Sequence, residues 1–234
     1  MELELLGWPP DGPKLRLDHE RFSYAGKFVM TNTGKAVARA DDGRTDARAT
    51  GNDGEKTDDR ARASESVARA VDSDGRAPDY DDDVLAAASF NEDRTDAETL
   101  WIRYVTVAKP RRGNGIGPKL LAFVRDRATD RGYARVRIAV NNPFAYEALY
   151  RAGFAFTGET TGLAELVLEH SPAEDRPTSV SASDESGIET RIEDETPVDE
   201  SERRDAARYR DGLERFRERE LSDPEEEFLS ERLD

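Results

Sequence analysis

The most informative stretch of the sequence is Arg111-Arg112-Gly113-Asn114-Gly115-Ile116-Gly117-Pro118. An apolar run over residues 99–107 precedes it and an amphipathic run over residues 117–131 follows, which predicts a strand, a glycine-rich turn and a helix. In that geometry the backbone N–H groups of the turn and the positive end of the helix dipole face one point in space. Such a point binds a phosphate or a pyrophosphate. The alternative is a tight glycine turn that binds nothing.

Two common phosphate-binding motifs do not fit this turn. A Walker A loop requires Lys followed by Ser or Thr after its last glycine, whereas Gly117 is followed by Pro118 and Lys119. A dinucleotide-binding G-x-G-x-x-G fingerprint would need glycine at position 118 or 120, and neither position has one. The pattern that does fit is R-x-x-G-x-G, over residues 112–117.

The sequence around this turn predicts alternating strands and helices. Beyond the helix over residues 117–131, residues 134–140 predict a strand, and a helix begins at Pro143 and is closed by Gly153. Residues 154–157 and 163–168 predict two final strands, so that the order is βαβαββ. Upstream lie strand-like runs over residues 27–39 and 84–91, and at most a short helix around residues 19–24.

The charge is distributed unevenly along the 234 residues. The formal net charge is −16, of which residues 41–83 contribute −7 and residues 171–234 contribute −12, so that the remainder is mildly basic. Only six of the 35 basic residues are lysine. Because a high net charge keeps proteins soluble in concentrated salt, this bias favours a halophilic archaeon as the source. Acidic tails of an ordinary kind are the alternative.

Two polar segments divide the sequence. Residues 41–83 have too few apolar side chains to offset the entropy of ordering, which predicts a disordered acidic insertion within a domain over residues 1–170. Residues 171–201 are rich in Ser, Thr, Pro and acids and predict a disordered linker. Residues 202–234 predict a charged helical tail with a capping box at residues 222–225. This tail is interpreted either as a solvated helix or as an element that docks on the core or on a protein partner.

The composition excludes several classes of function. The absence of cysteine rules out disulfides and thiolate chemistry, and with two histidines no metal site is expected. No apolar run approaches the ~20 residues that span a bilayer, so that a cytoplasmic protein without a membrane partner is expected. No basic stripe with interleaved aromatic residues is found outside the glycine turn, and nucleic acid is therefore not an expected partner.

A second cluster supports the first. Leu149 and Tyr150 lie near the end of a predicted helix and are followed by Gly153-Phe154 and a strand. Together the two clusters make the sequence resemble the GCN5-related N-acetyltransferase (GNAT) superfamily. That family has an R/Q-x-x-G-x-G/A turn after its fourth strand and an L-Y-x-x-x-G-F pattern at the end of a later helix. The resemblance implies an α/β fold, acyl-CoA N-acyltransferase-like, with a mixed, mostly antiparallel central sheet and flanking helices.

The same resemblance implies acetyl-CoA as the acyl donor. The amides of the turn would hold its pyrophosphate, basic side chains beside the turn would add charge, and the main chain at the end of the preceding strand would pair with the pantetheine arm. The cofactor-binding residues so implied are Tyr104, Val105, Thr106, Val107, Arg111, Arg112, Gly113, Asn114, Gly115, Ile116, Gly117, Lys119 and Asn142.

The resemblance also implies that Tyr150 protonates the departing CoA thiolate as general acid. A packing tyrosine is the alternative. The family's asparagine lies seven residues before its tyrosine, where this sequence has Pro143, with Asn142 and Asn141 just before it. Asn142 is therefore either a pantetheine contact or a helix cap.

The predicted activity is acetyl transfer from acetyl-CoA to an amine by direct attack. No residue stands out as the general base, for which the candidates are Glu98, Glu165, Asp18, Glu20, His19 and a chain of water molecules. One alternative is a non-catalytic module that binds acyl-CoA or a protein partner. Another is an enzyme that acetylates protein N-termini or lysines. The acidic tail is also predicted to fold back on the basic mouth of the cofactor site at low salt.

Overall fold

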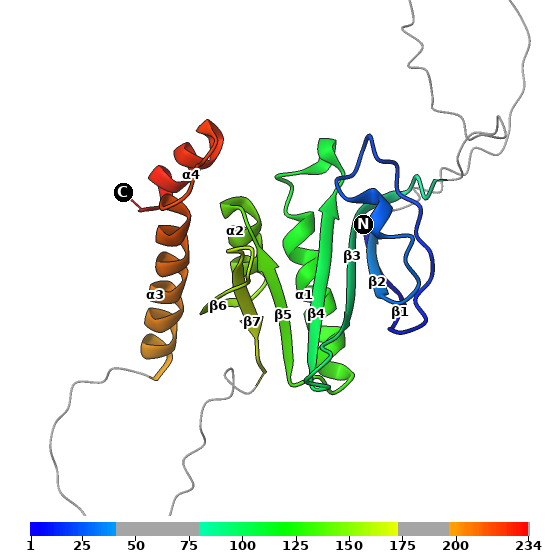
Figure 1. Ribbon diagram of the computed structural model, residues 1–234, viewed down its shortest axis with the longest axis horizontal. Helices are drawn as coiled ribbons and strands as arrows, with labels where there is room; N and C mark the ends of the chain where they lie inside the picture. Colours follow the sequence, from blue (N-terminus) through cyan, green and yellow to red (C-terminus); the bar gives the residue numbers. More distant parts are fainter. Residues whose placement is uncertain (41–79, 173–196, 234) are drawn as a thin grey trace, which may run out of the picture.

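The computed structural model describes residues 1–40, 80–172 and 197–233 (Figure 1). Residues 41–79 of the predicted insertion and residues 173–196 of the predicted linker lie outside the described residues. The last residues of the predicted insertion are held in place. The backbone N–H of Ala40 donates to the carbonyl of Asp83 at 2.9 Å, and the guanidinium of Arg39 bonds the Asp83 carboxylate at 2.8 Å. The two strands that flank the insertion are therefore tied together at its base.

A seven-stranded sheet forms the centre of the molecule. Its strands are β1 (Glu2–Gly7), β2 (Gly34–Arg39), β3 (Val84–Glu92), β4 (Thr99–Val107), β5 (Arg135–Val140), β6 (Ala155–Thr160) and β7 (Leu166–His170). They lie in the order β1-β2-β3-β4-β5-β7-β6. Only β4 and β5 run parallel, so the sheet is mixed and mostly antiparallel, which confirms the predicted fold class.

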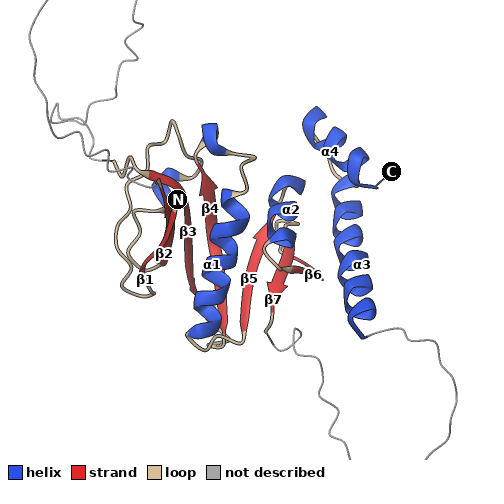
Figure 2. Cartoon of the chain, turned by 180° about the vertical axis from the view of Figure 1, so that it is seen from behind, coloured by secondary structure: helices blue, strands red, loops and turns tan. Residues whose placement is uncertain are grey.

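Helices flank this sheet. They are the short 3-10 helices η1 (Ala25–Lys27) and η2 (Lys109–Arg111) and the α-helices α1 (Ile116–Asp130), α2 (Pro143–Arg151), α3 (Pro197–Arg217) and α4 (Asp223–Leu233). Figure 2 shows α1 in front of the sheet, with α2 beside it and α3 beyond α2. Helix α1 buries Leu120, Leu121, Val124 and Ala128, the face that its sequence predicts. No described helix is long and apolar enough to cross a membrane.

Two hydrophobic cores lie on the two faces of the sheet. The larger core joins α1, α2, α3 and α4 to one face through residues such as Ala88, Leu120 and Leu149. The smaller one joins the segment over residues 15–28 to the other face, where Phe22 and Phe28 pack on Ala87. The predicted helix around residues 19–24 is not formed; the segment contains only η1. Strand β2 likewise begins at Gly34 and not near Lys27.

Strands β4 and β5 separate after four residue pairs. The register runs from Thr99 opposite Arg135 to Ile102 opposite Ile138 and then stops, although both strands continue. On its other edge β4 has an irregularity between Ile102 and Tyr104, opposite Ser89 and Phe90 of β3. Such a bulge bends the strand and increases its twist. The end of β4, residues 104–107, is therefore paired with β3 alone.

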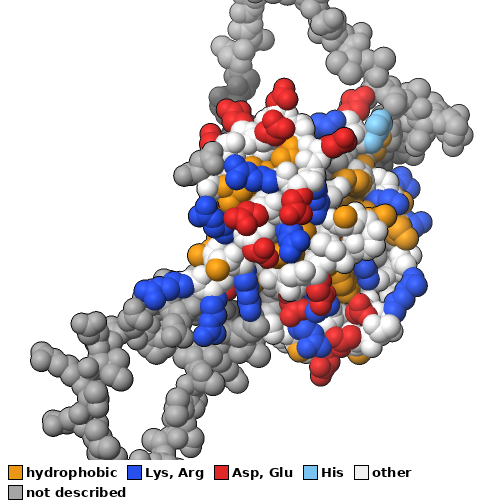
Figure 3. Space-filling view, turned by 60° about the vertical axis from the view of Figure 1, so that its left-hand side comes forward, with side chains coloured by type: hydrophobic (Ala, Val, Ile, Leu, Met, Phe, Trp, Pro, Cys, Tyr) orange, Lys and Arg blue, Asp and Glu red, His pale blue; other side chains and the backbone are white. Residues whose placement is uncertain are grey.

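The C-terminal helices pack on α2 and β6. Leu213 and Phe216 of α3 are fully buried, and Leu229 of α4 is nearly so. The side chain of Arg219 donates to the carbonyl of Ala164 in the β6–β7 turn at 2.5 Å. The helix begins at Pro197, five residues before the predicted start, and the predicted capping box is confirmed by hydrogen bonds from Ser222 to Glu225. On the face in Figure 3, acidic and basic side chains are interspersed.

Gly212 shows how closely α3 approaches the domain. A Cβ atom at this position would lie 2.0 Å from the hydroxyl oxygen of Tyr146 on α2. The same hydroxyl donates to the carbonyls of Arg208 and Tyr209, each at 3.2 Å. Since β6 is the edge strand of the sheet, α3 also covers an edge that could otherwise pair with another chain.

We expect Leu213→Ala to lower the free energy of unfolding by about 2–5 kcal/mol, because it leaves a cavity in the larger core. The matched control is Leu163→Ala, since Leu163 is 84% exposed. That substitution should change stability by less than about 0.5 kcal/mol. Urea unfolding followed by circular dichroism measures both. Equal stabilities of the two variants would mean that α3 contributes nothing to the fold.

Candidate functional site

The glycine turn joins the end of β4 to the start of α1 through η2. Gly113 has φ of 79° and Gly115 has φ of 71°, and Gly115 is the N-cap of α1. An L-residue other than glycine would pay about 1–2 kcal/mol in this left-handed conformation. The two glycines are therefore required by the backbone path of the turn.

The backbone amides of this turn are available to a ligand. Within the described part of the chain, none of the N–H groups of residues 113–117 donates a hydrogen bond. The first bond of the helix runs from the N–H of Lys119 to the carbonyl of Gly115, and Pro118 has no N–H to satisfy. A Cβ atom at Gly113 or Gly115 would meet nothing within 4 Å, so the surface of the turn is open. Five donors at the positive end of a helix dipole form an anion site.

One of the basic side chains near the turn bonds other parts of the chain. Arg112 does not extend freely towards the amides: its guanidinium donates to Ser23 Oγ at 2.9 Å and to the carbonyl of Val107 at 3.3 Å. It thereby ties the turn to the N-terminal segment. Arg111 and Lys119 are exposed, with no ion pair to any described residue. That these two side chains hold the outer phosphate of the cofactor stays a prediction.

At the end of β4 one edge of the backbone has no strand partner. Val105 and Val107 pack towards the core beneath α1, whereas Tyr104 packs on the smaller core on the opposite face. The hydroxyl of Thr106 is buried and has no hydrogen-bond partner among the described residues. Because β5 has already separated, the N–H and C=O groups that alternate along this edge lack a strand partner. The short helix η2 separates this edge from the glycine turn.

Asn142 caps α2. Its side-chain Oδ1 accepts a hydrogen bond from the N–H of Ala145 at 2.8 Å, and Pro143 occupies the first turn. This is the helix-cap interpretation of that residue. The cap uses the side-chain oxygen of Asn142 and leaves its amide nitrogen with one long hydrogen bond, to Asn141 Oδ1 at 3.4 Å. That nitrogen bonds no other described group, so the cap does not by itself exclude a ligand.

Tyr150 lies against the C-terminal tail. Its ring stacks on that of Tyr209 of α3, with centroids 4.2 Å apart and an interplanar angle of 27°. Helix α2 lies between α1 and α3, so the ring is packed on the α3 side of α2 (Figure 2). The turn lies at the start of α1, on the other side. The structure thus joins Tyr150 to the tail.

The spacing of the second motif explains this orientation. The L-Y-x-x-x-G-F pattern has three residues between its tyrosine and glycine, whereas only Arg151 and Ala152 separate Tyr150 from Gly153. Counting back from Gly153 places the tyrosine position at Leu149, which is buried in the larger core. Seven residues before Leu149 is Asn142, the family's asparagine position. A shift of one residue therefore accounts for both departures from the pattern.

Tyr209 is at the centre of the contact between α2 and α3. Its ring also stacks on Tyr146, at 5.7 Å, and its hydroxyl donates to the carboxylate of Glu147. Burial and this carboxylate raise the pKa of the Tyr209 phenol, and burial raises the pKa of the Tyr146 phenol. Both phenols therefore stay neutral and act as hydrogen-bond donors within the contact.

The proposed bases are scattered. Glu98 precedes β4 at the end remote from the glycine turn, and Glu165 lies near the β6–β7 turn, where its carboxylate accepts from Thr161 at 3.0 Å. Asp18 accepts from the N–H of Glu20 at 2.8 Å, with His19 Nδ1 4.0 Å away. Of these residues only His19 lines a cavity beside the end of β4. The described residues contain no group of three acids or histidines that could hold a metal ion.

Residues 48–154 match the model of the acetyltransferase (GNAT) family. The match covers less than half of the 234 residues and includes both the glycine turn and the Gly153-Phe154 cluster. No curated protein matches the chain.

Solved acetyltransferase structures are similar to part of the chain. One is a GCN5-related N-acetyltransferase from Kribbella flavida, at 26% identity and a TM-score of 0.33, over 43% of this chain and 64% of that one. A second is an N-acetyltransferase from Staphylococcus aureus Mu50, at 20% identity and a TM-score of 0.35, over 39% and 62%. A third is a phosphinothricin acetyltransferase from Sinorhizobium meliloti in complex with AcCoA, at 14% identity and a TM-score of 0.37, over 59% and 60%. The chain thus spans less than two thirds of the length of each of these structures.

Two contacts of the candidate site were not predicted. The bond from Arg112 to Ser23 joins residues 89 positions apart, and no local pattern signals such a contact. The stack of Tyr209 on Tyr150 was also missed, although the helical spacing of Tyr209, Leu213 and Phe216 did indicate an apolar face. The partner of such a face is decided by the fold and not by the pattern.

We expect Gly115→Ala to weaken CoA binding about tenfold or more, because a Cβ atom disfavours the backbone conformation that aligns the amides. Gly132→Ala is the matched control: Gly132 has φ of 99°, lies after α1 and is equally open. Both substitutions introduce backbone strain, but only the first disturbs the turn. Isothermal titration with CoA measures the difference. A similar dissociation constant for both variants would contradict a role of the turn in binding.

Proposed function

We propose that this protein transfers the acetyl group of acetyl-CoA to an amine. The observation that supports this most is the row of five backbone amides over residues 113–117, none of which has an acceptor within the described chain. These donors lie next to the unpaired edge of β4. A diphosphate on the amides and an extended, hydrogen-bonding arm along the edge would together satisfy both sets of groups. CoA carries a diphosphate and an amide-containing arm in that order.

Acetyl-CoA supplies an activated thioester to this site. In the proposed step the acceptor nitrogen attacks the thioester carbonyl, the carbon–sulfur bond breaks, the nitrogen loses a proton and the thiolate takes one up. Amides of residues 105–107 on the free edge of β4 would stabilise the charge on the carbonyl oxygen. Side-chain groups are not needed to bind the diphosphate, since the main chain of the turn provides its donors.

Tyr150 is the proton donor that the sequence predicts for the thiolate. Its ring stacks on Tyr209 of α3, and the role requires the hydroxyl to lie beside the sulfur of the bound thioester. Water is the alternative proton source if the ring stays where it is. Protonation by water also fits the position of Leu149 in the motif.

We expect Tyr150→Phe to lower kcat by ~10² or more if the phenol is the general acid, with little change in CoA affinity. Tyr209→Phe is the matched control, since it removes the other phenol of the same stack and has no place in the proposed chemistry. Steady-state kinetics of both variants distinguishes the two roles. An unchanged kcat for Tyr150→Phe would refute the acid role, and equal losses in both variants would assign Tyr150 to packing.

Transfer itself is tested by CoA release with acetyl-CoA and two pools of acceptors, small amines and N-terminal peptides, each at low and high salt. Release above the acceptor-free rate with the first pool supports the proposed function. Release with peptides alone favours the protein acetyltransferase. CoA binding without release in either pool favours the non-catalytic module. Higher activity at high salt would support the predicted halophilic origin.

A further inference from the structure

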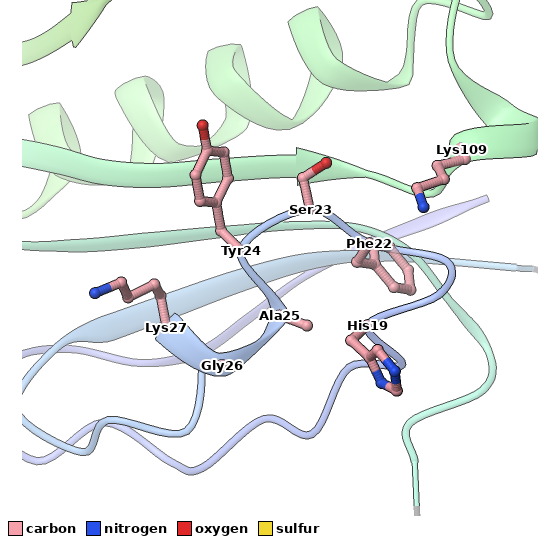
Figure 4. Close-up of a pocket in the computed structure, with 8 residues that line it drawn as sticks. All are labelled: His19, Phe22, Ser23, Tyr24, Ala25, Gly26, Lys27 and Lys109. Atoms are coloured by element: carbon pink, nitrogen blue, oxygen red, sulfur yellow. The ribbon is translucent and has the colours of Figure 1, made fainter. Parts of the chain in front are cut away.

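A cavity of about 640 Å³ lies beside the end of β4 (Figure 4). It is lined by His19, Phe22, Ser23, Tyr24, Ala25, Gly26, Lys27 and Lys109. All but Lys109 come from the N-terminal segment that covers the sheet on the face opposite α1. Lys109 lies two residues after the end of β4 and begins η2. Its backbone N–H donates to the carbonyl of Arg21 at 2.9 Å. The cavity is thus formed where the N-terminal segment meets the end of β4.

The charge of this cavity is opposite to that of the protein. Two lysines line it and no carboxylate does, in a chain whose formal net charge is −16. Neither lysine forms an ion pair with a described residue; the ammonium of Lys27 lies over the ring of Tyr104, 5.7 Å from its centroid. In Figure 4 the two lysines lie at opposite ends of the cavity. Cationic groups without counter-ions at a concave surface attract an anion.

The backbone of the cavity wall carries strain. Tyr24 has φ of 59°, in the left-handed region that non-glycine residues seldom occupy, and its side chain is 61% exposed. Its ring lies 6.0 Å from that of Tyr104, at an angle of 39°. Strained residues of this kind gather at ligand sites. An exposed tyrosine held over β4 gives the cavity an apolar surface between its two cations.

The cavity adjoins the proposed transfer site through two residues. Tyr104 lies in the part of β4 that β5 does not pair, and its ring faces Tyr24 and Lys27. Arg112, which begins the glycine turn motif, bonds Ser23 on the cavity wall. A molecule in the cavity would therefore lie against the strand along which the thioester is proposed to sit, on the face opposite α1.

We propose that this cavity binds the acetyl acceptor and selects an amine that also carries a carboxylate or a phosphate group. This inference rests on the proposed function. Lys27 or Lys109 would hold the anionic group by a charge-assisted hydrogen bond. The amine is then the part of the acceptor left free to face β4. A second cationic group on the acceptor is repelled, so polyamines are poor acceptors.

The same positive charge bears on the missing base. Nearby cations disfavour the protonated form of an amine, which raises the fraction of neutral, nucleophilic acceptor. The site therefore needs no carboxylate beside the amine, in agreement with the scattered positions of Glu98 and Glu165.

Three acceptors of equal chain length test the inference: 4-aminobutyrate, butylamine and 1,4-diaminobutane, whose far ends are anionic, apolar and cationic. We expect kcat/KM from CoA release to fall in that order, by about tenfold from the first to the second. The double substitution Lys27→Ala with Lys109→Ala should lower kcat/KM for 4-aminobutyrate more than for butylamine. Lys27→Arg should retain the preference. Lys14→Ala, at an exposed lysine outside the cavity, should not alter it.

Equal rates for the three acceptors, or a preference for 1,4-diaminobutane, would overturn the inference and leave acetyl transfer intact. The 3′-phosphate of the cofactor is another anion that these lysines could bind. A loss of activity in the double variant that disappears with 3′-dephospho-acetyl-CoA would assign them to the cofactor and also overturn it.

A binding measurement tests whether the cavity selects an anionic acceptor, and it does not require turnover. The backbone amide resonances of Gly26 and Lys109 are followed while CoA-saturated protein is titrated with 4-aminobutyrate and then with butylamine. Shifts that saturate with the first compound at least tenfold earlier support the cavity as an anion-selecting site, even if transfer fails in every assay. Identical titrations overturn it.

Discussion

The divergence of β4 from β5 is the constraint on which the functional part of this molecule depends. A strand inside a sheet normally has both of its edges satisfied, yet β4 loses its second partner after Ile102 and continues to Val107. The bulge at residue 103 bends β4 where it pairs with β3, at the point where β4 separates from β5. The chain then turns into five amides that α1 cannot use. The edge of β4 without a strand partner and the open amides are separated by residues 108–112, whose N–H groups are bonded. The proposed ligand, with a diphosphate and an extended polar arm, matches both sets of groups.

The C-terminal helices complete the domain at its other end. β6 is an edge strand, and α2 presents Tyr146 and Tyr150 on the side away from α1. Helix α3 covers both features and buries Leu213 and Phe216 as part of the larger core. The acidic residues of this helix are placed there and not at the glycine turn. The tail therefore acts on the domain through α2, whose orientation it fixes by aromatic stacking.

Local patterns predicted the elements of the ordered core well. The strand over residues 99–107 matches β4, and the helix over residues 117–131 differs from α1 by one residue at each end. Glycines after helices marked their ends, since Gly132 and Gly153 both take positive φ. The N-terminal segment was predicted poorly. Lys35 lies in a predicted strand, and its side chain is fully buried, with the ammonium bonded to the carbonyls of Met30 and Thr33. The alternation of apolar and polar residues along a strand does not predict a buried lysine.

The sequence by itself determined the glycine turn, the strand and helix on either side of it, and hence the anion site, because these depend on backbone conformations that a few neighbouring residues dictate. Only the tertiary structure decided where side chains from distant elements meet. It stacked Tyr150 on Tyr209 of α3, bonded Arg112 to Ser23, and placed Lys27 and Lys109 around one cavity. A helix exposes several faces, and which neighbour each face receives is set by how the layers pack, which no local spacing encodes.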